Sequence, residues 1–105
     1  MAKRDARVVA LEALYAADAR GEAPDPEGLP GRAARLCSGV GDHLGALHVH
    51  IASAASGWRI ERMPSFDGNI LRLGLYEFRY TETPGGVVIS EAVELAKAYS
   101  TERSV

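Results

Sequence analysis

Apolar residues recur every three or four positions along almost the whole of this 105-residue chain, the spacing that places side chains on one face of an α-helix. The alternation typical of a β-strand occurs only at residues 87–89, where the helical register absorbs it. The helical pattern is clearest over residues 69–97, in which Thr83-Pro84 separates two helical stretches. The sequence therefore predicts an all-α fold with four or five helices.

Glycine and proline divide this pattern into segments. Residues 21–30 contain three prolines and two glycines and are expected to form a loop. The loop separates an N-terminal helix at 4–20 from a helical region at 31–105. Glycines lie inside that region, each costing about 1 kcal/mol relative to alanine, so we expect a break or bend near residues 39–42. At this length, residues 1–105 are expected to form one domain.

Two prolines mark where the later helices are expected to begin. Pro64 can occupy the first turn of a helix, where its missing N–H costs nothing. Thr83 is expected to be an N-cap, with Pro84 at the first helical position. The helix after Pro64 carries a wide apolar stripe, which suits a central helix packed on several neighbours. The stripe combines two faces, one with Phe66, Ile70, Leu73 and Glu77 and one with Leu71, Leu75 and Phe78.

Composition bounds the class of protein. The formal net charge is −2, so any surface that attracts nucleic acid must be local. The one cysteine, Cys37, cannot form an internal disulfide and is expected to be a buried packing residue in a reducing compartment. No apolar run approaches the roughly 18 residues of a membrane span, and the N-terminus does not resemble a signal peptide. These features predict a cytoplasmic protein without a membrane partner.

No residue pattern indicates catalysis, a cofactor or a metal. His43, His48 and His50 lack the spacing and the additional ligands of a zinc site. Glu91 and Glu94 are neighbours on a helix, and such a pair is more often solvated than catalytic. No phosphate-binding glycine loop or nucleophile motif is present. We therefore expect a protein that is not an enzyme.

Three cations, Lys3, Arg4 and Arg7, cluster at the N-terminus. Helical spacing makes Lys3 and Arg7 neighbours, and likewise Arg4 and Arg7. Such a cluster could hold a phosphate backbone. From the residues alone, a solvated helix end is the more common explanation.

Four segments in order resemble the NusB family of bacterial RNA-binding transcription proteins. Residues 3–15 carry Lys-Arg-x-Ala-Arg followed by Ala-Leu-Glu-Ala-Leu-Tyr, and residues 57–63 read Gly-Trp-Arg-Ile-Glu-Arg-Met. Residues 67–77 read Asp-Gly-Asn-Ile-Leu-Arg-Leu-Gly-Leu-Tyr-Glu, and residues 84–97 end in Glu-Ala-Val-Glu-Leu-Ala-Lys. RNA-binding domains of ribosomal RNA cytosine methyltransferases share part of this pattern. The tail Ala-Tyr-Ser-Thr-Glu at residues 98–102 favours the NusB family itself.

The resemblance implies a compact bundle of about five helices in two small three-helix-type subdomains. It also implies a function: binding boxA-type RNA of ribosomal operons together with NusE, a small-subunit ribosomal protein, and thereby acting indirectly on the RNA polymerase elongation complex. By position, it implies two sets of site residues. They are Lys3, Arg4 and Arg7 for RNA, and Tyr15 and Asp67 for the partner protein. Arg103 departs from the family, which usually has an acid there, and we expect it to add positive charge to the same RNA site.

Some positions depart from the family pattern. Gly68 stands where Arg or Lys is usual, and Ser90 replaces the usual Asn. The family continues with a further helix beyond the position of Val105, so we expect the face with Leu71, Leu75 and Phe78 to be uncovered. This face motivates the hypothesis of a homodimer. The alternative functions are a helical interaction module without RNA binding and an RNA-binding domain of the methyltransferase lineage.

Overall fold

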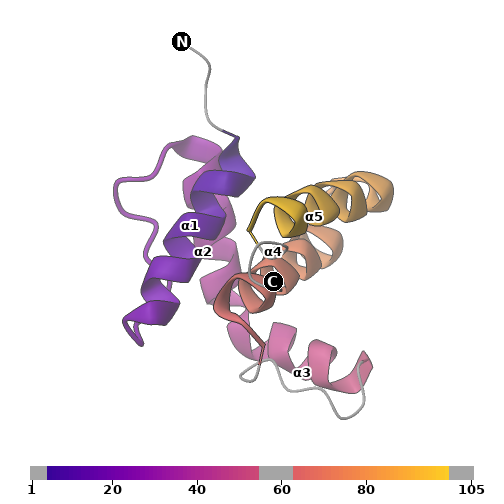
Figure 1. Ribbon diagram of the computed structural model, residues 1–105, viewed down its shortest axis with the longest axis horizontal. Coiled ribbons are helices and arrows are strands. Elements are labelled where there is room, and N and C mark those ends of the chain that lie inside the picture. Colours follow the sequence, from indigo (N-terminus) through magenta and orange to yellow (C-terminus); the bar gives the residue numbers. More distant parts are fainter. Residues whose placement is uncertain (1–4, 55–62, 100–105) are drawn as a thin grey trace.

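The computed structural model describes residues 5–54 and 63–99, and this part of the chain contains helices and no strand. The helices are α1 (Ala6–Ala19), α2 (Gly31–Asp42), α3 (Leu44–Ala54), α4 (Ser65–Tyr80) and α5 (Gly85–Tyr99), as labelled in Figure 1. The prediction of an all-α bundle of about five helices is confirmed.

Helix α4 occupies the centre of the bundle. It packs against each of α1, α2, α3 and α5. Figure 1 shows α1 and α2 together on one side of α4 and α5 along its other side, with α3 below. The wide apolar stripe of α4 explains this position, because a helix with several buried faces needs several neighbours.

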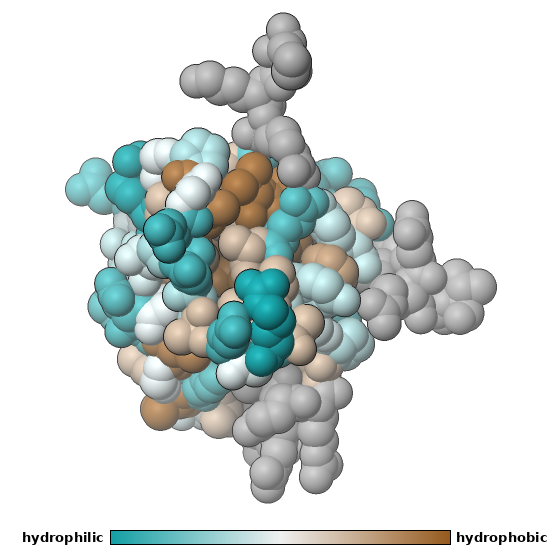
Figure 2. Space-filling model, turned by 90° about the vertical axis from the view of Figure 1, so that its left-hand side faces the viewer, coloured by the Kyte–Doolittle hydropathy of each residue, from teal (hydrophilic) through white to brown (hydrophobic). Residues whose placement is uncertain are grey.

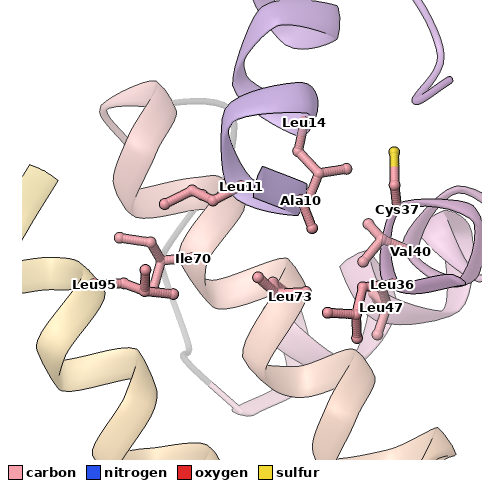
Figure 3. Close-up of a cluster of buried hydrophobic side chains, with 10 residues drawn as sticks. All are labelled: Ala10, Leu11, Leu14, Leu36, Cys37, Val40, Leu47, Ile70, Leu73 and Leu95. Carbon is pink, nitrogen blue, oxygen red and sulfur yellow. The ribbon is translucent and has the colours of Figure 1, made fainter. Parts of the chain in front are cut away.

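The core forms where the inner faces of the helices meet (Figure 3). Leu73 of α4 lies almost fully buried between the side chains of α1 and those of α2 and α3. Cys37 is fully buried, as predicted, and this burial raises the pKa of its thiol above the ordinary value. The cluster consists of Ala10, Leu11, Leu14, Leu36, Cys37, Val40, Leu47, Ile70, Leu73 and Leu95.

Local signals set the bounds of α1. Asp5 has an extended backbone, and its Oδ1 accepts a hydrogen bond of 2.7 Å from the Arg7 N–H, which makes it the N-cap. At the other end, Gly21 has a φ of 68°. Only glycine adopts this left-handed conformation readily, so the helix stops there.

The helical region after the loop is broken at His43, between α2 and α3, one residue beyond the predicted range of 39–42. Gly39, inside that range, has another role. The ring of Tyr76 lies directly against Gly39, where no side chain intervenes. The glycine therefore allows α2 and α4 to approach closely.

Helices α4 and α5 each begin one residue later than predicted. Pro64 precedes α4 as its N-cap and is not in its first turn. Pro84 precedes α5, and its carbonyl accepts a hydrogen bond of 3.1 Å from the Val88 N–H. The Thr83 hydroxyl is engaged elsewhere: it accepts a hydrogen bond from the Thr81 hydroxyl and donates one to Glu77. This explains why Thr83 does not cap α5.

An apolar groove of about 570 Å³ runs between α4 and α5. Leu71 and Phe78 are exposed along it, and Leu75 is half-buried. Within residues 5–54 and 63–99, its lining comes from α4, α5 and Met63, which precedes α4. The groove is lined by Met63, Asp67, Ile70, Leu71, Gly74, Leu75, Phe78, Val88, Ile89, Ala92 and Ala96.

The close approach at Gly39 predicts a specific sensitivity. A methyl group in Gly39→Ala would overlap the Tyr76 ring, so we expect destabilisation by about 1–3 kcal/mol, as for other overpacked sites. Gly45→Ala is the matched control, because no atom lies near that position and alanine favours a helix. Chemical denaturation should show a lower stability for Gly39→Ala only; equal stabilities would contradict the packing described.

Candidate nucleic-acid interface

Arg7 and Glu77 form a buried ion pair between the first turn of α1 and the last turn of α4. Arg7 Nε donates to Glu77 Oε2 at 2.7 Å, and Arg7 Nη2 donates to Glu77 Oε1 at 2.8 Å. Arg7 is 7% exposed and Glu77 is 2% exposed. The two hydrogen bonds fix the relative orientation of the side chains as well as their distance.

Three side chains from other elements reach this ion pair. Arg32 of α2 donates to Glu77 Oε1 at 3.5 Å, and the Thr83 hydroxyl, from the turn between α4 and α5, donates to the same oxygen at 3.5 Å. Glu91 of α5 places its Oε1 3.9 Å from Arg7 Nη1. We call these five residues the Arg7–Glu77 cluster. It joins α1, α2, α4 and α5 at one end of the bundle.

The cluster holds Arg7 in its charged state. The hydrogen bond with Glu77 raises the pKa of Arg7 above its ordinary value, although burial acts in the opposite direction, and the negative charges of Glu77, Glu91 and Asp5 add to the increase. Moving the guanidinium out to a ligand would leave the Glu77 carboxylate buried without its main partner. That loss would cost several kcal/mol.

The resemblance implies RNA contact at Arg7, and the structure buries the guanidinium of this residue against Glu77. A sequence signal for this existed. Arg7 shares the helical face of Leu11 and Leu14, and Glu77 shares the face of Leu73, so each apolar face carried one charge of opposite sign. The other predicted RNA residues, Lys3, Arg4 and Arg103, lie outside the described residues.

Arg32 is a cation at this end of the bundle that was not among the predicted site residues. Its side chain is 47% exposed while its guanidinium reaches Glu77. A lone arginine near a helix start has no pattern that distinguishes it from a solvated residue. On the side of the molecule that α1, α2 and the loop between them form, hydrophilic side chains surround smaller hydrophobic areas (Figure 2). This side is thus available to a polar ligand.

The predicted partner residue Tyr15 lies at the other end of α1. Its ring stacks on Phe66 with the ring centroids 3.9 Å apart, and Phe66 in turn packs against Tyr99 at 4.8 Å. Tyr15, Met63 and other residues line a cavity of about 380 Å³. The tyrosine therefore combines a packing role with a place beside an open depression.

Asp67, the second predicted partner residue, lies in the first turn of α4, where a carboxylate is stabilised by the helix dipole. It lines the apolar groove between α4 and α5. Met63 lines both this groove and the cavity beside Tyr15. The structure thus brings Tyr15 and Asp67 to the same end of α4, in adjoining depressions.

Polar side chains hold this end of α4 against the end of α1. Asp18 Oδ2 accepts hydrogen bonds from the Ser65 hydroxyl at 2.9 Å and from Asn69 Nδ2 at 3.2 Å, and it lies 3.6 Å from Arg72 Nη1. No sequence pattern links Asp18 to these partners, because they are far away in the chain. The network positions the Tyr15 and Asp67 surfaces relative to each other.

The three histidines do not gather. His48 Nε2 accepts a hydrogen bond of 2.9 Å from Arg72, and the His43 ring stacks on Tyr80. Over residues 5–54 and 63–99, no group of His, Cys, Asp and Glu side chains has the arrangement of a metal site.

Over residues 5–54 and 63–99, no helix is both long enough and apolar enough to cross a membrane.

Comparisons with known proteins extend over nearly the whole chain. A family model described as the NusB family matches residues 4–105. The chain is 42% identical to the transcription antitermination protein NusB of Salinispora arenicola, over 98% of this chain and 86% of that protein. It is 38% identical to the protein of the same name from Symbiobacterium thermophilum, over 99% and 82%, and 40% identical to that of Acidothermus cellulolyticus, over 98% and 79%.

The buried cluster predicts unequal effects of two similar substitutions. Glu77→Gln removes the charge that Arg7 needs, so we expect a loss of about 3–5 kcal/mol in the free energy of unfolding, as for other broken buried pairs. Glu91→Gln removes a carboxylate that is partly exposed and farther from Arg7, and should cost less than about 1 kcal/mol. Urea denaturation of both variants measures the difference, and a similar small effect for both would contradict a central role for Glu77.

Proposed function

The chain belongs to the NusB family of transcription antitermination proteins, and we propose that it binds boxA-type RNA of ribosomal operons together with NusE. The match to the family over residues 4–105 carries this proposal. Through the two partners, the protein would act indirectly on the RNA polymerase elongation complex. Its role is recognition, without catalysis and without a cofactor.

The geometry of the Arg7–Glu77 cluster supports an RNA site at that end of the bundle. Lys3 and Arg4 directly precede the N-cap Asp5 in the sequence, and α1 begins at the cluster. The positive end of a helix dipole adds to the attraction of phosphate. Arg32 adds a partly exposed cation beside the same turn. In this proposal, Lys3, Arg4 and Arg103 contact RNA, and Arg7 positions the first turn of α1.

The surface at the other end of α1 is our proposal for the NusE site. Tyr15 offers an aromatic ring held rigid by its stack on Phe66, and rigid aromatic side chains bind protein partners at low entropic cost. Asp67 adds a carboxylate at the rim of an apolar groove. The arrangement combines an apolar area with a charge that sets orientation, as in many protein interfaces.

The proposal for RNA is tested by titrating labelled boxA-type RNA with the protein at two salt concentrations, with and without NusE. We expect affinity to fall with salt. Arg4→Ala should reduce the slope of log affinity against log salt by about 0.7 for each phosphate that the variant no longer neutralises. Arg20→Ala is the matched control, because Arg20 lies at the opposite end of α1 in an exposed pair with Glu22. Absence of salt-sensitive binding under both conditions would overturn RNA binding and leave a helical interaction module.

The proposal for NusE is tested by calorimetry with Tyr15→Ala and Asp67→Asn. We expect each to weaken NusE binding by about tenfold, which corresponds to about 1.4 kcal/mol. Glu94→Gln is the control, because Glu94 is exposed on α5 in a pair with Lys97. Circular dichroism establishes that the variants are folded. Unchanged affinity in folded Asp67→Asn would remove Asp67 from the interface.

A further inference from the structure

Three aromatic rings lie together beside the junction of α2 and α3. The His43 ring stacks on the Tyr80 ring with centroids 3.9 Å apart and planes 15° apart. Tyr76 completes the group, with its centroid 5.8 Å from that of Tyr80 and 6.0 Å from that of His43. Tyr76 is held by its contact with Gly39, whereas Tyr80 is 40% exposed at the end of α4. The group therefore has one ring held in the bundle and one ring partly exposed.

Two arginines lie beside one of these rings. Arg32 and Arg35 of α2 line, with Tyr76, a cavity of about 280 Å³ that also contains Thr81 and Thr83. Arg35 is exposed, and none of the ion pairs within the described ranges includes it. The cavity therefore combines guanidinium groups and an aromatic edge with the two threonine hydroxyls.

The charges around these rings favour an anionic ligand. Arg32 and Arg35 line the cavity beside Tyr76, and Arg32 also contacts Glu77. In the sequence, Arg79 directly precedes Tyr80, Asp42 directly precedes His43, and Glu82 follows Tyr80 by two residues. The buried acid at the cavity, Glu77, is already neutralised by Arg7. Guanidinium groups beside stacked aromatic rings are the features with which proteins hold single-stranded nucleic acid, because each base offers a flat face and each nucleotide a phosphate.

We propose that the surface formed by Arg32, Arg35, Tyr76, Tyr80 and His43, which we call the α2–α4 surface, binds unpaired nucleotides that flank the boxA-type segment. The inference rests on the proposed function and extends its site. Continuity supports it: Arg32 belongs both to this surface and to the Arg7–Glu77 cluster at the start of α1. An RNA strand bound at the start of α1 thus has a path along α2 to the three aromatic rings. The guanidinium of Arg35 holds a phosphate, and Tyr80 stacks on a base.

The test compares two labelled single-stranded RNAs by fluorescence anisotropy. One carries the boxA-type segment alone, and the other carries it with about six unpaired nucleotides on each side, within the usual site size of single-strand binders. We expect Tyr80→Ala and Arg35→Ala each to weaken binding of the longer RNA by about tenfold, as for the loss of one stacked base or one charged group. Binding of the shorter RNA should change less than about twofold, because it is held at the start of α1.

Conservative variants separate recognition from folding. Tyr80→Phe keeps the ring and should bind both RNAs as the unmodified protein does, and Arg35→Lys keeps the charge and should retain most of the affinity at low salt. Arg20→Ala is the control for loss of an exposed arginine elsewhere. A thermal melt of each variant verifies that it is folded.

Each outcome decides the proposal. If the unmodified protein binds neither RNA, the proposed function itself fails, and this inference fails with it. If the unmodified protein binds both RNAs with equal affinity, and Tyr80→Ala and Arg35→Ala bind them as the unmodified protein does, the proposed function stands and the α2–α4 surface is not an RNA site. If Tyr80→Ala or Arg35→Ala weakens NusE binding and leaves both RNA affinities unchanged, the surface is a protein contact and the inference is overturned.

Discussion

The buried ion pair of Arg7 and Glu77 is the interaction on which the arrangement of this bundle depends. Apolar contacts between helices are non-directional and tolerate small rotations. Two parallel hydrogen bonds between a guanidinium and a carboxylate do not, and here they join α1 to α4. Arg32, Thr83 and Glu91 also contact this ion pair. The positions of α2 and α5 relative to α1 and α4 therefore depend on it as well. The start of α1 is thus held where an RNA site is proposed.

The two ends of α1 serve different surfaces. At its start, buried charges orient the helix, and cations lie before it in the sequence and beside it on α2. At its end, Asp18 holds the beginning of α4 through Ser65 and Asn69, and the Tyr15 ring stacks nearby. One helix thereby sets the distance between the proposed RNA and partner surfaces. The polar networks lie at both ends of an apolar core, and they fix the position of the proposed RNA site relative to the proposed partner site.

Much of the fold was predictable, and the site was predictable only in part. The period of the apolar residues identified the helices, and the burial of Cys37 followed from its place in that pattern. Helices α4 and α5 begin one residue later than predicted. At α5, the Thr83 hydroxyl bonds to Glu77 of the preceding helix and does not serve as the predicted N-cap. The resemblance places Arg7 among the RNA contacts. The apolar face that Arg7 shares with Leu11 and Leu14 indicates that it is buried, but its partner Glu77 is 70 residues away and follows only from the tertiary structure.

The sequence alone determined the helical class, the loop at 21–30, the central position of the helix after Pro64 and, through resemblance, the family. These properties follow from periodicity and from short motifs, which act over a few residues. Only the tertiary structure decided which charges are buried and which are exposed. It paired Arg7 with Glu77, left Arg32 partly exposed and placed Tyr80 against His43. The physical reason is that the burial and the contacts of a charged or aromatic side chain depend on the residues packed against it. Those residues come from distant parts of the chain.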